Sequence, residues 1–567
     1  MRKIFSLKHF WIYLVIILFF IAKDAYSQDL SNIGKKKPVK ISGSLGTTQT
    51  YYGVTGIPNR RPPYLWYLNG NLNIDIYGWS IPFSASWSNQ NRNGEYRQPF
   101  NQYGLSPTYK WVTLHAGYRS LTFSPYTLAG HTFLGTGVEL NPGKWRFAAM
   151  YGRLNKAVAE DTLGGRNEVP SYQRIGYGVK AGISKDGDFI DLIFFTAKDD
   201  LNSIPYVPVQ NYITPAENMV VSVNAQKKLG KKTVFAFEYA TSAYTRDIRS
   251  QVTEQDSKNI FSPVFTHKGS TQYYDAFRSN LTYNAKFCSM QVGYERIEPE
   301  YRTMGAYFFN NDLENITIAP SFRLFRQKVN LNLNTGLQRN NIEDTNMNST
   351  QRILGSVNCS FVPNQKWSFM GQYSNFVSYS RISKRFDQFQ SLDTLNFYQV
   401  TESANFNTGY NSTDKEKRHG INLNLSYQRA NQTQGEQVTN NESKFYNGNL
   451  AYRYSILPMN MNIIAGINGN QNSMAATSSF AFGPTVSLSK TFFDKKLRTS
   501  LTTTVNNILT DKVLTARAVS IGLSSGYTYQ KRNNFSFNAT VLNKYAKSAS
   551  VSDFTEFTGT FSYMYSF

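Results

Sequence analysis

Apolar and polar residues alternate along much of this chain of 567 residues. The stretch VNLNLNTGLQ, from Val329 to Gln338, begins with Val and Leu at odd positions and Asn at even ones. The stretch INLNLSYQ, from Ile421 to Gln428, repeats the pattern. A period of two is typical of a β-strand with one apolar and one polar face. Such segments recur from end to end without a helical period, so the sequence predicts an all-β protein.

The connections between these segments alternate between short and long. Short ones such as NPGK and SKDGD contain Gly, Pro and Asp, which favour tight turns. Long polar connections are predicted at 154–171, 198–217, 243–271, 297–313, 339–350, 429–442, 471–479, 507–516 and 544–554. Short periplasmic turns that alternate with longer outer loops are typical of an outer-membrane barrel, whose strands alternate apolar-out and polar-in. The pattern therefore predicts a transmembrane, antiparallel, up-and-down β-barrel.

The side of the barrel on which each loop lies limits the number of strands. The loops that begin near 377 and near 429 must both lie on the outer side, so a single strand at 418–428 cannot join them. The stretch from Thr394 to Thr408 is the best candidate for a further strand between them. With it we expect about 26 strands, within a range of roughly 24 to 28, and both ends of the barrel on the periplasmic side.

The first residues have the composition of a signal peptide. A basic start at Arg2 and Lys3 precedes an apolar run from Phe10 to Ala22, and small residues follow at the spacing that a signal peptidase recognises. The apolar run is shorter than the roughly 20 residues of a transmembrane helix. We expect a cleaved signal peptide at 1–27, a short periplasmic segment at 28–39 and the barrel at 40–567.

The polar face of the predicted strands is mainly uncharged. Charged residues make up 17% of the chain, whereas an average soluble domain has roughly 25%. Asn, Gln, Ser and Thr suit a barrel lumen, because neighbouring strands supply their hydrogen-bond partners and an unpaired charge is costly there. The residues that we expect to line the lumen are Asn330, Asn332, Asn334, Asn422, Asn424, His115 and Arg119.

The final strand carries aromatic residues at alternate positions. In TFSYMYSF these are Phe561, Tyr563, Tyr565 and Phe567. This stretch resembles the C-terminal signal by which barrel-assembly machinery recognises outer-membrane proteins, and the resemblance implies that machinery as a partner during biogenesis. The Tyr- and Asn-rich sequence, with stretches such as FSPYTLAGHTFLGTGVELNPGKWRFAAMYGRL, is similar to large outer-membrane barrels of Bacteroidota. The resemblance implies a location in the outer membrane of a Gram-negative bacterium, in contact with its lipid.

One segment is dense in charged and aromatic residues. The stretch YERIEPEYRTMGAYFFNNDLEN, residues 294–315, includes the long connection predicted at 297–313. We expect this loop to fold inward and constrict the lumen, or to contact a protein partner; a solvated loop with aromatic residues at its base is the alternative. The candidate residues are Arg296, Glu298, Glu300, Arg302, Tyr307, Phe308 and Asp312.

The sequence offers little for catalysis. The two cysteines, Cys288 and Cys359, fall on apolar strand faces about three strands apart, too far for a disulfide, which needs Cα atoms within roughly 7 Å. No histidine is paired at metal-ligand spacing, and neither His131 nor His267 stands beside a nucleophile motif. We therefore expect no enzymatic activity, no metal and no cofactor.

The net charge of +23 can favour binding to anionic lipid, anionic solutes or nucleic acid. Export through a signal peptide makes nucleic acid the least favoured of these, and we expect none. A barrel of this size would be leaky if its lumen were empty. Two functions follow: a porin-like transport channel narrowed by its own loops, or an accessory subunit of a secretion or surface assembly whose lumen or outer loops another protein occupies.

Overall fold

The structure, a computed structural model, describes residues 39–89, 101–160, 170–205, 213–253, 261, 264–307, 310–340, 342, 351–381, 396–434, 437–474, 477–548 and 552–567. The predicted signal peptide lies outside these residues. No helix in the described part of the chain is long and apolar enough to cross a membrane.

The described residues form 27 labelled strands. Their bounds are β1 Val39–Thr55, β2 Tyr64–Ile76, β3 Trp79–Ser88, β4 Gln102–Leu105, β5 Thr108–Tyr109, β6 Val112–Thr122, β7 Ala129–Leu140, β8 Trp145–Asn155, β9 Arg174–Lys185, β10 Asp188–Asp199, β11 Glu217–Leu229, β12 Thr233–Thr245, β13 Thr271–Asn284, β14 Cys288–Ile297, β15 Leu313–Leu324, β16 Val329–Arg339, β17 Gln351–Phe361, β18 Trp367–Arg381, β19 Asn396–Thr413, β20 Lys417–Gln434, β21 Gln437–Ile456, β22 Met461–Met474, β23 Thr477–Phe492, β24 Leu497–Thr510, β25 Val513–Tyr529, β26 Asn533–Ala546 and β27 Phe554–Ser566.

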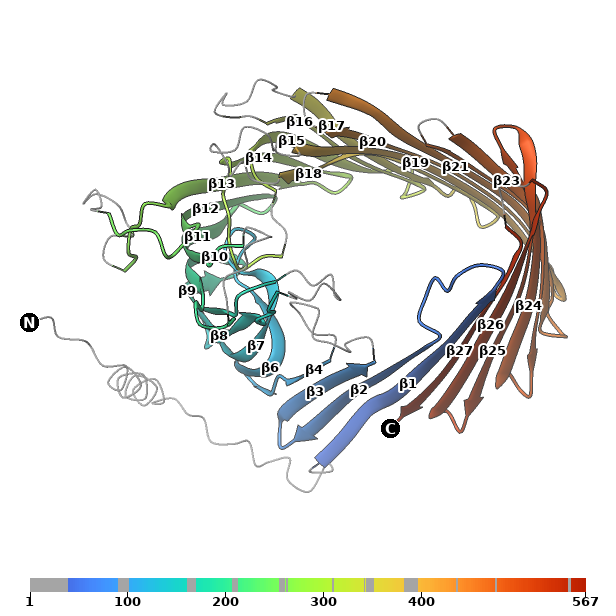
Figure 1. The fold of residues 1–567 in the computed structure, drawn as a ribbon, viewed down its shortest axis with the longest axis horizontal. Coiled ribbons are helices and arrows are strands. Elements are labelled where there is room, and N and C mark those ends of the chain that lie inside the picture. The colour runs from blue at the N-terminus through green and yellow to red at the C-terminus, as the bar shows by residue number, and fades with distance from the viewer. Residues whose placement is uncertain are drawn as a thin grey trace, which may run out of the picture.

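The strands close into one antiparallel barrel (Figure 1). Each position in the barrel pairs with the next along the chain, and β1 pairs with β27 from Ser44 opposite Ser566 to Thr55 opposite Thr555. The short strands β4 and β5 together fill one position between β3 and β6. The barrel therefore has 26 strand positions, as the sequence predicts.

The register keeps one polar face on the inside of the barrel. Asn407 of β19 lies opposite Asn424 of β20, which lies opposite Asn449 of β21. The alternate residues form the outer face, where Leu450 is 50% exposed and Ile467 is 64% exposed. Polar side chains thus line the wall inside, while aliphatic side chains cover it outside.

Two predictions about strands and loops had different outcomes. The strand predicted at 394–408 exists as β19, which confirms the argument from the sides of the loops. The long loops predicted at 429–442, 471–479 and 507–516 are wrong, because β20 and β21, β22 and β23, and β24 and β25 continue through them to tight hairpins. Polar residues do not end a strand there, because the neighbouring strand continues to satisfy the backbone hydrogen-bonding groups.

The wall from β6 to β10 encloses a dry core inside the barrel. Phe133 of β7, Leu154 of β8 and Phe195 of β10 are all buried in one apolar cluster. Glycines on β9 make room for it: a Cβ on Gly178 would lie 2.9 Å from Cε2 of Phe123, and one on Gly176 would lie 2.8 Å from Cδ1 of Leu154. The inner wall of β6–β10 therefore contains an apolar patch, in contrast to the Asn-rich wall opposite.

The connection between β12 and β13 lies on the other side of the wall. Its residues Phe261 and Phe265 pack against Met219 and Ala243, and the cluster includes the outer residue Phe194. This loop therefore covers the outer face, as its place outside the barrel in Figure 1 shows.

Candidate functional site

Two connections from the same end of the barrel meet on its inner wall. The β6–β7 loop comprises residues 123–128, and the inner loop comprises residues 298–312 between β14 and β15. The hydroxyl of Tyr301 donates to the carbonyl of Tyr126 at 2.7 Å, and the hydroxyl of Thr303 donates to the carbonyl of Thr127 at 2.6 Å. The two loops are therefore joined through fixed backbone groups.

Asn218 of β11 ties the inner loop to the wall. Its side-chain Nδ2 donates to Ser242 Oγ at 2.8 Å, and its Oδ1 accepts the backbone N–H of Met304 at 3.0 Å. Ser242 Oγ in turn donates to the carbonyl of Arg302 at 2.7 Å. Asn218 and Ser242 are fully buried. Because an unpaired buried amide is costly, these bonds favour one position of the loop.

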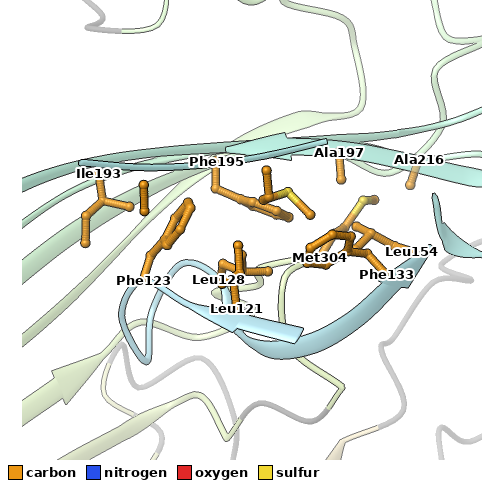
Figure 2. Packing of buried hydrophobic residues seen from close by; sticks show 12 residues of the cluster. Leu121, Phe123, Leu128, Phe133, Leu154, Ile193, Phe195, Ala197, Ala216 and Met304 are labelled. Atoms are coloured by element: carbon orange, nitrogen blue, oxygen red, sulfur yellow. The ribbon is translucent and has the colours of Figure 1, made fainter. Parts of the chain in front are cut away.

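Apolar packing reinforces these hydrogen bonds. Figure 2 shows Phe195 and Ala197 of β10 facing Leu128 of the β6–β7 loop and Met304 of the inner loop. Tyr301 belongs to a second buried cluster, which also contains Tyr126, Val220, Ala240, Ala276, Ile297 and Leu313. The inner loop therefore forms a folded layer on the lumen side of β10–β13.

Charged groups under this layer are paired. Glu238 of β12 is fully buried, and its Oε2 lies 3.0 Å from Arg278 Nη2 of β13. The Arg278 guanidinium lies over the ring of Tyr126, whose hydroxyl donates to Glu295 Oε1 at 2.6 Å. Pairing offsets much of the desolvation free energy of these buried charges. Removing one partner would leave the other charge buried without compensation.

Burial raises the pKa of the Tyr301 phenol well above its ordinary value, and the nearby Glu238 and Asp275 carboxylates raise it further. Burial also raises the pKa of Tyr126, with Glu295 as the next cause. Both phenols therefore stay protonated across the physiological range and keep their hydrogen bonds.

The structure brings together most of the residues predicted to form a constriction. Glu298 Oε2 accepts the backbone N–H of Asp275 at 2.7 Å, and Glu300 pairs with Arg246. The Arg302 guanidinium lies over the ring of Tyr244. These contacts attach the inner loop to the wall at β12 and β13 and to the first residue of the β12–β13 connection.

The remaining residues that were predicted for the loop differ in where they lie and in what they contact. The ring of Tyr307 stacks on His131 at 4.0 Å, and Asp312 Oδ1 accepts the backbone N–H of Ile342 at 3.1 Å. The inclusion of Arg296 was wrong, because it lies on β14 with the parity of the outer face, next to the inward Glu295. Successive side chains of a strand point to opposite faces of the sheet, whereas a loop prediction treats neighbouring residues alike. Phe308 lies outside the described residues.

The residues predicted to line the lumen share the inner face. Asn332 lies opposite Asn358, and its Oδ1 accepts from Ser321 Oγ at 2.5 Å. Asn407 donates to Asn424 across the β19–β20 pair. The others, Asn330, Asn334 and Asn422, keep the same parity on β16 and β20. Amides thus face the lumen in rows that cross several strands.

His115 and Arg119 lie on the same face of β6. His115 Nδ1 lies 3.0 Å from Ser106 Oγ, and its Nε2 lies 3.0 Å from Glu139 Oε1. Arg119 Nη1 donates to Ser84 Oγ at 2.8 Å. The hydroxyl contacts Nδ1 and the carboxylate contacts Nε2, the reverse of a serine-hydrolase triad, so we interpret the trio as a polar link between β7 and the β4–β5 connection.

Sequence reasoning missed Asn218 and the β6–β7 loop. The segment from Phe123 to Leu128 is only six residues long and contains no charge, so it gives no loop signal comparable with 297–313. Asn218 shares the inner face of β11 with the polar residues Ser222, Asn224 and Gln226, so its place in the sequence does not distinguish it from other lumen-facing polar residues. Only its complete burial marks it as a residue that needs specific hydrogen-bond partners.

Among the described residues, no group of three or more His, Cys, Asp or Glu could hold a metal ion. Cys288 and Cys359 are both free.

No protein-family model and no curated protein matches this sequence. Among solved structures, the translocation pore of the P pilus usher PapC is similar at 12% identity and a TM-score of 0.39, over 93% of this chain and 99% of that one. The ferric enterobactin receptor PfeA of Pseudomonas aeruginosa is similar at 8% identity and a TM-score of 0.37, over 93% of this chain and 80% of that one. OpdK of Pseudomonas aeruginosa is similar at 11% identity and a TM-score of 0.27, over 62% of this chain and 93% of that one. Because these TM-scores lie below 0.5, the barrel assignment rests on the strand order and register themselves.

Proposed function

We propose that this chain is an outer-membrane transport channel whose lumen its own inner loop narrows from one side. A closed barrel satisfies the backbone hydrogen bonds of its strands, which a sheet in lipid requires. The exposed aliphatic face, with residues such as Leu192 and Ile467, supports burial in lipid on the outside. Short turns at one end and longer loops at the other support an orientation with the short turns in the periplasm.

The packing of the inner loop on the lumen wall carries this proposal. Met304 and Tyr301 are buried there rather than exposed at the barrel mouth. The opposite wall, from β16 to β24, keeps an Asn-rich surface on the same face. A channel with one covered side and one amide-lined side favours hydrophilic solutes, because amides donate and accept hydrogen bonds without a fixed charge.

Conductance in a planar lipid bilayer tests this function. The purified single chain should form a steady open channel, and polyethylene glycols of increasing size should give its working radius. Replacing residues 299–311 with a short Gly-Ser linker should raise both conductance and radius. A variant that shortens the outer-face loop between β12 and β13 but keeps Arg246, which pairs with Glu300, is the control and should leave both unchanged.

The second candidate, an accessory subunit, predicts other results. Extraction in mild detergent from the native membrane would then yield a stoichiometric partner. The stripped chain would give erratic leakage, and the loop replacement would not change its radius. Those results together would overturn the channel.

A further inference from the structure

The two ends of the barrel differ in charge. The short-turn connections, at the end that holds β1's first residue and Phe567, carry thirteen basic and four acidic residues, and thirteen minus four gives +9. The described residues of the connections at the opposite end include nine basic and eight acidic residues, and nine minus eight gives +1. We call the basic set the basic rim: Lys110, Lys144, Lys231, Lys232, Lys286, Arg326, Lys328, Lys366, Lys415, Lys495, Lys496, Lys531 and Arg532.

Every residue of the basic rim is exposed. The members of the rim come from nine short turns between β5–β6 and β25–β26, whereas the β2–β3, β9–β10 and β21–β22 turns carry no basic residue. The four acidic residues, Asp186, Asp414, Glu416 and Asp494, sit in only three of these turns. Basic side chains therefore lie around most of the perimeter at this end of the barrel.

Exposed aromatic side chains accompany these cations. In five turns an aromatic residue is the direct neighbour of a basic one: Lys110 and Trp111, Lys144 and Trp145, Lys286 and Phe287, Phe325 and Arg326, and Lys366 and Trp367. Phe325 is 73% exposed and Phe287 is 62% exposed. Trp145 and Trp367 lie on the outer face, opposite in parity to the inward Arg146 and Ser368. Aromatic rings at headgroup level and cations beside them are the pattern of a membrane interface.

We propose that the basic rim binds anionic phospholipid headgroups in the leaflet at the short-turn end of the barrel. This inference rests on the proposed outer-membrane location, which puts these turns at the periplasmic leaflet. Lipid surrounds a barrel on all sides, and the basic rim follows most of the perimeter, whereas a docked acidic protein would need a patch on one sector. Lys and Arg near a bilayer surface attract anionic lipid, and salt weakens the attraction.

The test is lipid selection by the full-length barrel. The protein is reconstituted into vesicles of phosphatidylcholine with a minor fraction of phosphatidylglycerol, extracted gently, and its retained lipid is measured by mass spectrometry. We expect phosphatidylglycerol to be enriched several-fold over the bulk. Enrichment should fall toward the bulk ratio in a variant with K144Q, K286Q, K366Q and K531Q, and at high salt.

The matched control changes four lysines toward the opposite end, K156Q, K198Q, K512Q and K547Q. It removes the same charge and should keep the enrichment. Equal enrichment in both variants, or none in the unmodified protein, would overturn the proposal. Recovery of an acidic protein bound to the rim in place of lipid would overturn it as well. Conductance of both variants is measured in parallel, so a failed channel is distinguished from a failed lipid site.

Discussion

The hydroxyl of Tyr301 donates a hydrogen bond to the backbone carbonyl of Tyr126 at 2.7 Å, across 175 positions of sequence. Both side chains are buried, and their rings meet edge to face at 6.2 Å. This contact joins the inner loop to the β6–β7 loop on the lumen wall. Substitutions at this contact can therefore loosen the packing of the inner loop without changing the strands of the barrel.

Tyr301→Ala should release the inner loop. A cavity of this size costs about 3–5 kcal/mol of local packing free energy, so the loop should become sensitive to protease and the conductance should rise. Tyr301→Phe is the matched control. It keeps the ring and loses one hydrogen bond worth about 1 kcal/mol, so it should retain the original conductance with a small loss of protection. Unchanged conductance in Tyr301→Ala would contradict a constriction by this loop.

Asn218→Ala should weaken the same loop from the wall side. The substitution leaves the N–H of Met304 and the hydroxyl of Ser242 without this partner, at a cost of about 1–3 kcal/mol. Hydrogen exchange should speed up at residues 301–305 while β16–β24 stays protected. Asn449→Ala, on the open amide wall, is the control and should leave exchange in the loop unchanged.

Alkaline pH should loosen the inner loop. The pKa of Tyr301 is raised in the folded state above its ordinary value of 10.0, so the unfolded loop loses its proton first as pH rises. Stability is therefore fully present below about pH 10 and is lost as pH increases beyond that value. Proteolysis of the loop as a function of pH measures this, and Tyr301→Phe should flatten the dependence.

Gly135→Ala should impair barrel formation. A Cβ at this position would lie 2.0 Å from the carbonyl oxygen of Tyr151 and 2.5 Å from Cα of Gly152, so the β7–β8 pair must separate. The cost should exceed the roughly 1–3 kcal/mol of ordinary overpacking. Gly371→Ala on β18 is the matched control, because nothing lies within 4 Å of its Cβ. Folded and heat-denatured barrels migrate differently in gel electrophoresis. The fraction of folded barrel in unheated samples should fall only for Gly135→Ala.

Cysteine labelling should separate the two faces of β20. In a background without Cys288 and Cys359, Asn424→Cys should react with a charged, water-soluble thiol reagent in bilayers and lower the conductance. Leu425→Cys should not react, because its side chain lies on the aliphatic face. Labelling of Leu425→Cys alone would show that the inside and outside of the barrel are interchanged.

The sequence determined the barrel, because a period of two places every second side chain on one face regardless of the partner strand. It also determined β19, since loops must alternate between two sides. The candidate inner loop was visible from its charges and aromatic residues. Its residues nevertheless could not be sorted fully: Arg296 and Glu295 are neighbours in sequence, yet they point to opposite faces of β14.

Only the tertiary structure decided where the loops pack. Tyr301 meets Tyr126, and Met304 meets Asn218, across 175 and 86 positions of sequence. Local patterns carry no information about such pairs, because the contacts depend on how the curved wall brings β7, β11 and β14 toward one lumen. The same patterns failed at 429–442, where pairing with a neighbour continued a strand through polar residues. Periodicity is a property of one segment, whereas burial and strand length depend on what lies beside it.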